Sequence, residues 1–213
     1  MSRGQNELEL RLPTILAILR RILEALTFRW TNGDVDDRQF IESVALAVAA
    51  QRMRAQSIGR EIARRQMAEQ LGGPVDDLPP LPGSRADGLD RLTKAVSTIV
   101  SEHDPEDLET TTDRLDRLGR SETSKAAQDA AREVAEHDDR VRGWVRDLNA
   151  DACQLCEWWW REGRVFPADH VMPRHPGCDC WPRPVTVNYT PRVSPEAQKR
   201  SDRDRARLTK EKA

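Results

Sequence analysis

Apolar residues at helical spacing dominate the first part of the chain. One stripe, with intervals of four and three residues, consists of Leu8, Leu12, Ile15, Leu19, Ile22 and Leu26. This spacing places all six side chains on one face of a helix. Because proline is tolerated near a helix start, we expect the regular part to begin near Pro13. Asn32-Gly33 is expected to end the helix in a turn.

A second, longer helix is predicted from a cap at Asp34 or Asp36 to about Leu71, where Gly72-Gly73-Pro74 stops it. Its apolar positions thin out after Val48, so it offers few partners for the wide stripe of the first helix. That stripe is therefore buried either in a bundle within the chain or against another protein.

The segment 73–86 contains four prolines and reads as a linker and a domain boundary. Three shorter helices are predicted beyond it, over 87–100, from Asp104-Pro105 to Gly119, and over 121–148. The expected inner face of the first of these consists of Leu89, Leu92, Val96 and Ile99. The alanine-rich last helix indicates close helix–helix packing, or a helix that needs a partner.

All four cysteines lie between Cys153 and Cys180. Cys153 and Cys156 have the two-residue spacing with which two thiolates bind one metal from a tight turn, with main-chain amides directed at the sulfurs. Gly163 is expected to form a turn between two short strands. In a cytoplasmic protein such cysteines are more often ligands than disulfides, although two disulfides are the alternative.

The second half of the site is ambiguous. Pro176 and Gly177 occupy the two central positions of a type II turn, which would bring His175 and Cys178 to one ion. We rank Cys153, Cys156, Cys178 and His175 as the first choice of ligands, with Cys180 in place of His175 as the alternative. Thiolate and imidazole ligands at a closed four-coordinate site favour structural Zn²⁺ and leave no position for a substrate.

The fold class expected is mainly α, with an extended helical N-terminal region and helical hairpins, then a small α+β module resembling a zinc knuckle, and a basic disordered tail. The corresponding ranges are 1–72 (helical), 73–86 (linker), 87–150 (helical), 151–187 (Cys/His module) and 188–213 (tail). Aromatic residues make up only 5% of the chain, and five of the six tryptophans lie in its last third, so we expect the aromatic core in the module.

Charge and hydropathy exclude some classes of protein. The net charge of -2 gives no general attraction to nucleic acid or to anionic membranes. No run approaches the ~18 apolar residues of a membrane span, and Met1 to Glu9 lacks the pattern of a signal peptide, so we expect a soluble protein made in a cytoplasm. The tail from Arg192 to Lys212 is locally basic, which is typical of a solvated tail and can also contact a phosphate backbone.

Two enzyme classes and one class of DNA-binding module match the sequence only in part. The segment Ala168-Asp169-His170-Val171-Met172-Pro173 looks like the first histidine segment of an HNH endonuclease, but the chain has no histidine after His175. A Cys–His hydrolase is disfavoured because the cysteines have metal-ligand spacing. A regulatory DNA-binding module is disfavoured by the acidic overall charge and the absence of basic residues between Cys153 and Cys156. We therefore expect no enzymatic activity.

The motif resembles that of a phage family. The order Asp-x-Cys-x-x-Cys, Gly-Arg-Val-Phe and His-Pro-x-Cys-x-Cys, after an alanine-rich helix that ends in Trp-Val-Arg, is similar to the phage Mu F-like (MuF) head morphogenesis proteins. The similarity covers about 126–185. The matching positions are Cys153, Cys156, Gly163, Val165, Phe166, His175, Pro176, Cys178 and Cys180. Asp179 departs from the pattern, because the family often has arginine there.

The resemblance implies a minor capsid protein of a tailed phage, made in the host cytoplasm and located inside the head. Its expected partners are the portal protein, the major capsid protein, or both, with possible contact to packaged DNA through the basic tail and no membrane association.

Overall fold

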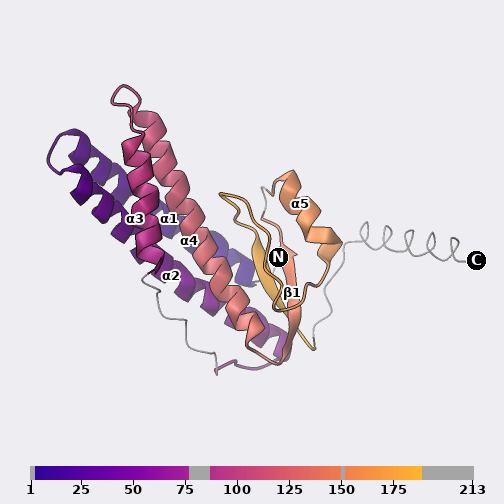
Figure 1. The fold of residues 1–213 in the computed structure, drawn as a ribbon. Helices are drawn as coiled ribbons and strands as arrows, with labels where there is room; N and C mark the ends of the chain where they lie inside the picture. Colours follow the sequence, from indigo (N-terminus) through magenta and orange to yellow (C-terminus); the bar gives the residue numbers. More distant parts are fainter. Residues whose placement is uncertain (1–2, 77–86, 150–151, 189–213) are drawn as a thin grey trace, which may run out of the picture.

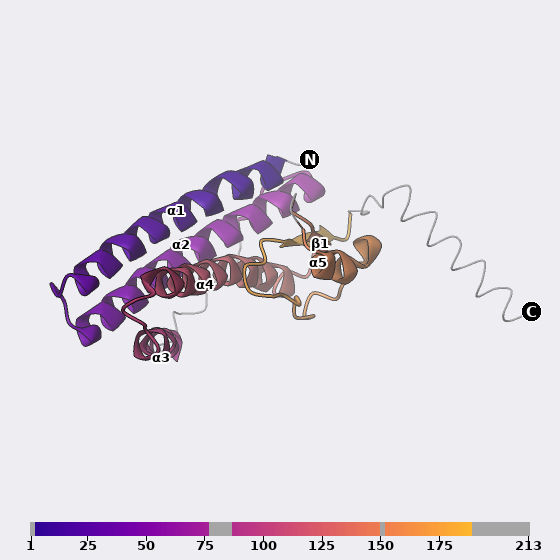
Figure 2. The same cartoon turned by 90° about the horizontal axis from the view of Figure 1, so that it is seen from above.

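Two long helices form a hairpin at the N-terminal side of the molecule. Helices α1 (Arg3–Thr31) and α2 (Asp37–Leu71) lie side by side (Figures 1 and 2). The Asp36 carboxylate accepts a 2.7 Å hydrogen bond from Gln39 N, and the Gln39 side chain accepts one from Asp36 N, which forms a capping box. Gly72, with a φ of 75°, ends α2. Of the two caps considered, the structure uses Asp36.

Pro13 does not mark the start of α1. The helix begins at Arg3 and contains Pro13, so the predicted start was wrong. Proline costs one main-chain hydrogen bond in a helix interior. The buried Leu12 and Ile15 beside it show that apolar packing holds the helix there despite that loss.

The apolar stripe of α1 faces the inside of this molecule. Leu12, Ile15 and Leu19 are buried, with 5, 7 and 2% of their surface exposed, and Leu23 is buried beside them. Leu26 is partly buried and packs against the same core as Leu19. The stripe from Leu12 to Leu26 is therefore part of the core of this molecule, as the first of the two alternatives expects.

The structure describes residues 3–76, 87–149 and 152–188 of the 213. Helix α3 (Asp87–Ser101) agrees with the prediction, except that Leu89 is exposed while Leu92, Val96 and Ile99 are buried. The predicted linker falls mainly on 77–86, and the basic tail on 189–213, and both ranges lie outside the described residues.

One helix, α4 (Leu108–Glu136), replaces the two helices predicted over 104–148. Its N-cap is Asp107, whose side chain accepts a hydrogen bond from Thr110 N, so the cap predicted at Asp104 was wrong. Gly119 does not end the helix. A Cβ at Gly119 would lie 2.8 Å from the Leu19 side chain, so glycine here permits the close approach of α1.

The predicted helix over 121–148 ends at Glu136, and its last part is a strand. Strand β1 (Val141–Asp147) pairs antiparallel with β2 (Trp181–Thr186). In this register Val141 is opposite Thr186 at one end, and Asp147 is opposite Trp181 at the other. The two strands form a two-stranded sheet. The chain between the two strands forms the Cys/His module, so the sheet holds the two ends of the module together.

The bundle contains two apolar cores. One, near the α1–α2 turn, combines α1, α2, α3 and α4 around Phe40, Leu92 and Leu115. The other, near the sheet, combines Leu12 and Ile62 with the alanines of α4, and it continues into Val141 and Trp181. Helices from both sides of the segment 77–86 share these cores, and the close helix packing predicted for the alanine-rich helix is confirmed.

The described helices include none that is both long and apolar enough to cross a membrane.

Candidate metal centre

The first two cysteines lie at the start of a short helix. Helix α5 (Gln154–Trp160) has Cys153 as its N-cap residue, and Cys156 lies in its first turn, so a helix replaces the strand predicted before Gly163. The main-chain N–H of Cys156 is directed at the Cys153 sulfur and lowers the pKa of that thiol. Burial, by contrast, raises the pKa of Cys156. The helix start thus favours a thiolate at Cys153.

The second half of the site is a turn from His175 to Cys178. Cys178 N donates to His175 O at 3.1 Å, and Gly177 has a φ of 76°, as the central glycine of a type II turn requires. His175 Nδ1 lies 3.0 Å from the carbonyl oxygen of Pro176. Because a carbonyl only accepts, Nδ1 carries the proton there, which leaves Nε2 free to bind a metal.

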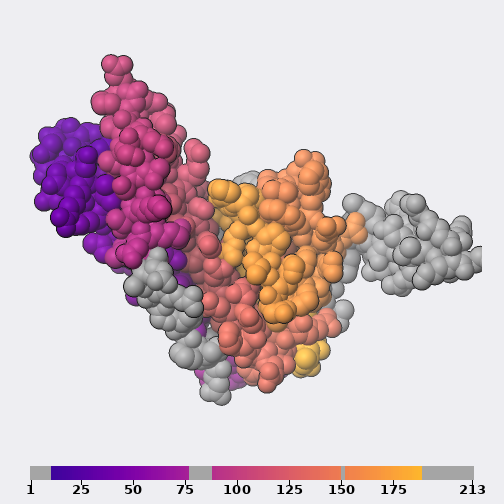
Figure 3. Space-filling view, in the orientation of Figure 1, coloured from indigo at the N-terminus to yellow at the C-terminus, as the bar shows by residue number. Residues whose placement is uncertain are grey.

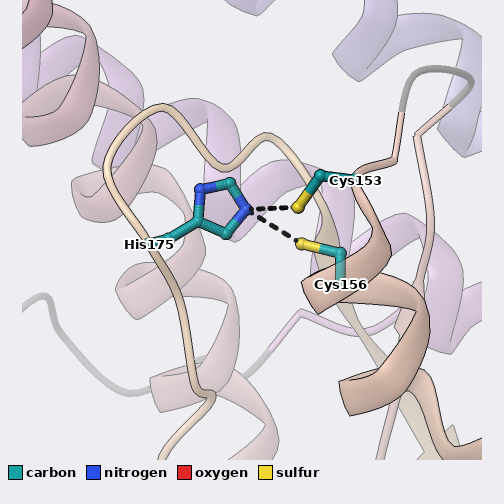
Figure 4. A group of neighbouring side chains, drawn as sticks. All are labelled: Cys153, Cys156 and His175. Carbon is teal, nitrogen blue, oxygen red and sulfur yellow. Dashed lines mark hydrogen bonds between the residues drawn. The ribbon is translucent and has the colours of Figure 1, made fainter.

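The two halves meet at His175 Nε2 (Figure 4). This atom lies 3.1 Å from Cys153 Sγ and 3.2 Å from Cys156 Sγ, and Cys156 Sγ lies 3.4 Å from Cys178 Sγ. Ligand atoms around tetrahedral Zn²⁺ are separated by about 3.5–3.8 Å, given bond lengths near 2.0–2.3 Å. The Cys153, Cys156 and His175 atoms are therefore close enough to share one ion, and Cys178 lies beside them through its contact with Cys156.

Two overlapping groups of ligand atoms can hold a metal. Cys153, Cys156 and His175 form one, and Cys156, Cys178 and Cys180 form the other. Cys156 belongs to both groups. All four cysteines are free in the structure, and the alternative of two disulfides is not what it shows. The geometry brings together every ligand that the sequence proposed.

Hydrogen bonding gives Cys178 and Cys180, two of the three cysteines in the second group, pKa values shifted in opposite directions. A hydrogen bond from the Cys180 thiol lowers the pKa of Cys178 to about 5, aided by the Cys180 main-chain N–H and by the charge of Arg146. The same contact with Cys178, together with burial, raises the pKa of Cys180. The Cys180 sulfur also lies 3.6 Å from Asn149 Oδ1. Cys178 is thus the more readily ionised thiol of the pair.

A buried arginine faces the cysteines. Arg146, on β1, is 1% exposed, and its Nη1 lies 3.8 Å from the sulfurs of both Cys156 and Cys178. Its Nη2 donates to the carbonyl oxygen of Pro173. Its guanidinium lies 5.4 Å from the centroid of the Trp159 ring. A buried positive charge therefore lies beside the candidate ligands, and the residue that carries it is not part of the Cys/His motifs.

The module is anchored to α4 on one side, where Figure 3 shows it beside the bundle. Gln128 Nε2 donates to the carbonyl oxygens of Cys178 and Cys180, at 2.7 and 2.8 Å. Ser124 Oγ donates to Asp179 Oδ1 at 2.8 Å. Asp179, which departs from the resembled motif, thus has a partner on α4. These contacts hold the Cys178–Cys180 segment at a fixed place on the bundle.

Aromatic packing supports the opposite side. The Trp144 and Phe166 rings stack at 4.6 Å, and these two residues exchange main-chain hydrogen bonds of 2.9 and 2.8 Å. A Cβ at Gly143 would lie 2.0 Å from Phe166 O, so only glycine fits there. Trp144, Phe166, Met172 and three of the cysteines form a separate core. An aromatic core therefore lies at the module, as predicted, but it is not confined there, because Trp30 stacks on the buried Phe40 in the bundle.

The segment 168–173, which resembles part of an HNH nuclease motif, lies outside the group of candidate metal ligands. The His170 ring stacks on the Phe166 ring with centroids 5.1 Å apart. The main-chain carbonyl oxygen of His170 accepts a hydrogen bond from Trp144 Nε1. Within the described chain, neither Asp169 nor His170 belongs to a group able to hold a metal. His170 therefore packs against the aromatic core of the module.

Sequence reasoning missed Arg146 and Gln128. Both act through contacts between segments far apart in the chain, so the spacing of residues gives no sign of them. The one signal of Arg146 in the sequence is a single charge within the run Gly143-Trp144-Val145-Arg146, once that run is taken as a strand with buried neighbours.

Fold and site together define a helical bundle that carries a Cys/His module able to hold a metal. Comparison with family models, curated proteins and solved structures found no match.

Proposed function

We propose that the module is a structural zinc site in a minor capsid or head morphogenesis protein of the MuF-like type. The observation that supports it best is the meeting of both halves of the resembled motif at one centre, with His175 Nε2 3.1 Å from Cys153 Sγ and 3.2 Å from Cys156 Sγ. That centre follows the alanine-rich helix α4, as in the resembled order, although the Trp144-Val145-Arg146 segment expected at the end of that helix lies on β1.

The donor atoms favour zinc. Thiolates and imidazole are soft or borderline ligands, which suit Zn²⁺ far better than Mg²⁺ or Ca²⁺. A structural role fits the burial of Cys156 and Cys178 within the core of the module. A small module with so few apolar residues gains much of its folding free energy from such an ion.

An assembly role is favoured over catalysis. With four protein ligands the ion has no open position for water or substrate. The alternative, an HNH-like nuclease, would need a metal-binding or catalytic partner for His170, and the described residues place its ring against Phe166. We therefore propose a protein without enzymatic activity.

We propose the capsid interior as the location and the portal or the major capsid protein as the partner. The buried part of the apolar stripe of α1, with Leu12, Ile15 and Leu19, is core and is not available for docking. The exposed apolar side chains include Phe28 on α1, at 65%, Leu46 and Met53 on α2, at 56% each, and Trp158 on α5, at 63%. The basic residues from Arg192 to Lys212 are proposed to contact packaged DNA.

The zinc proposal is tested by elemental analysis of the purified full-length protein, with about one zinc per chain expected. Chelation should unfold the module, detected by the fluorescence of its tryptophans, and leave most of the helical circular dichroism. Metal-free protein with all four thiols in disulfides would rule the proposal out.

The capsid proposal is tested by expressing the chain with the portal, scaffold and major capsid genes of the same genome and isolating heads. The chain should sediment with the heads. Trp158→Ser and Phe28→Ser, both at exposed positions, should identify whether the module or the bundle docks, by which of them lowers incorporation. A chain that stays outside the heads and cleaves DNA in a metal-dependent reaction would support the nuclease instead.

A further inference from the structure

Among the described residues, Arg146 is a buried cation whose candidate anionic partners are all cysteines. Its side chain is 1% exposed, and within the part of the chain that the structure describes its Nε has no hydrogen-bond partner. In the described chain, the recorded contacts of its guanidinium are with two cysteine sulfurs, the Pro173 carbonyl oxygen and the Trp159 ring. None of these is a carboxylate.

A guanidinium does not lose its proton inside a protein, so Arg146 is charged wherever it lies. Burying a cation without a counter-charge costs several kcal/mol. The Cys156 and Cys178 sulfurs, each 3.8 Å from Nη1, meet that need only as thiolates, because a neutral thiol is a weak acceptor. Metal binding produces such thiolates.

The charge of the centre then depends on its ligands. Zn²⁺ with three thiolates and a neutral imidazole carries a net charge of −1, and with four thiolates it carries −2. A single guanidinium neutralises the first and leaves the second with one uncompensated negative charge. The nearby Trp144, Phe166 and Met172 form an apolar core, in which a neutral centre is favoured.

We propose that Arg146 is the charge-compensating positioning residue of the metal centre, and that it selects Cys153, Cys156, His175 and Cys178 as ligands and leaves Cys180 outside the coordination sphere. The inference rests on the proposed zinc site and extends it. Arg146 contacts the Cys156 and Cys178 sulfurs. The Cys180 sulfur lies within 4.8 Å of both and instead contacts Asn149 Oδ1 at 3.6 Å.

Arg146 also joins the two halves of the site. It contacts α5 through Cys156 and Trp159, and the loop before His175 through Pro173. The Trp159 ring in turn lies 6.2 Å from the His175 ring. One side chain from β1 thereby sets the distance between the helix that carries two cysteines and the turn that carries the histidine.

The test uses the full-length protein with three substitutions on β1. Arg146→Met removes the charge and keeps much of the volume, Arg146→Lys keeps the charge, and Arg142→Met is the matched control at an exposed position of the same strand. Zinc affinity is measured by competition with a chromophoric chelator. Cobalt is then substituted for zinc, and the intensity of its sulfur-to-metal absorption band reports the number of thiolates bound.

Arg146→Met should bind zinc roughly 10–100-fold more weakly, as substitutions behind metal ligands typically do. Arg146→Lys should recover most of that loss, and Arg142→Met should match the wild type. Cys180→Ser should leave the cobalt band unchanged, and Cys178→Ser should weaken it.

Three results would overturn the inference. Equal affinities for Arg146→Met and the wild type would show that the charge is not needed. Equal loss in Arg146→Met and Arg146→Lys, including a shared failure to fold, would show a packing role alone. A cobalt band that weakens in Cys180→Ser would put Cys180 among the ligands. Absence of metal from the wild type is a different failure, because it rejects the proposed zinc site itself.

Discussion

Gly59 of α2 packs directly on the main chain of Ala127 in α4. A Cβ added at Gly59 would lie 2.1 Å from Ala127 O, a distance that no side chain can accommodate without moving a helix. The two helices therefore approach more closely here than any larger residue would allow, at the point where the alanine face of α4 enters the core.

Gly59→Ala should destabilise the bundle, because overpacking of this kind typically costs about 1–3 kcal/mol and here meets main chain. Alanine's better helix propensity offsets up to about 1 kcal/mol of that cost. Urea unfolding followed by circular dichroism measures the change. Gly73→Ala is the control, since nothing lies within 4 Å of a Cβ there. A Gly59→Ala protein as stable as the control would mean that the helices can separate without cost.

Cys156→Ser should abolish stoichiometric metal binding, because Cys156 belongs to both groups of candidate ligands. The module should lose its fixed structure while α1, α2 and α4 remain helical, since their cores consist of other residues. Elemental analysis and near-ultraviolet circular dichroism measure the two effects. Leu155→Ser, at an exposed neighbouring position, should retain the metal. Full metal content in Cys156→Ser would place the ion elsewhere.

Glu122 of α4 joins three helices through its carboxylate. Arg91 Nη1 donates to it at 2.9 Å, and Arg52 Nε lies 3.5 Å away. Burial alone would raise the pKa of Glu122, but the hydrogen bonds and charge of Arg91, with the charge of Arg52, outweigh burial and lower it. A lowered pKa in the folded protein contributes stability above the unfolded value, which is lost as the pH falls through the folded value.

Glu122→Gln should therefore cost about 1–3 kcal/mol at neutral pH, as expected for hydrogen bonds to charged groups. The difference from the wild type should shrink once the pH drops below about 4.3, the pKa of an unfolded glutamate. Unfolding free energies across the acid range measure it. Glu109→Gln, at an exposed position of the same helix, is the control. A difference that does not change with pH would mean that the Glu122 charge contributes nothing.

Gln128→Ala should loosen the second half of the metal site from the bundle. It removes two hydrogen bonds to main-chain oxygens, those of Cys178 and Cys180, and leaves these buried acceptors without that donor. The expected cost is about 1–3 kcal/mol of stability, with faster release of metal to a chelator. Lys125→Ala, exposed on the same helix, should behave as the wild type. Unchanged release in Gln128→Ala would show that the turn holds its shape without α4.

Local signals in the sequence predicted much of this fold. The Asp36 cap, the Gly33 turn and the Gly72 stop are governed by residues within a few positions, and each lies where the sequence placed it. The turn from His175 to Cys178 follows from the same kind of local chemistry.

The failures depend on contacts between distant segments. Val141 to Asp147 continues a helical pattern, and only its pairing with residues 181–186 makes it a strand. Gly119 resembles a helix stop until the Leu19 side chain is seen against it. The same reason hid Arg146, whose partners lie between 10 and 32 positions away in the chain.

The pairing of β1 with β2 also decides how the molecule would respond to tension. The whole metal-binding segment lies between the two strands in the sequence. The strands pair along their length, from the pair Val141–Thr186 to the pair Asp147–Trp181. Force applied to the chain beyond Val187 and resisted at the bundle passes from β2 to β1 through these hydrogen bonds, and to α2 through Gln70, which binds Pro184 O and Thr186 N. The metal-binding segment between the strands is thus not on the path of the force, and it comes under tension only after the two strands have separated.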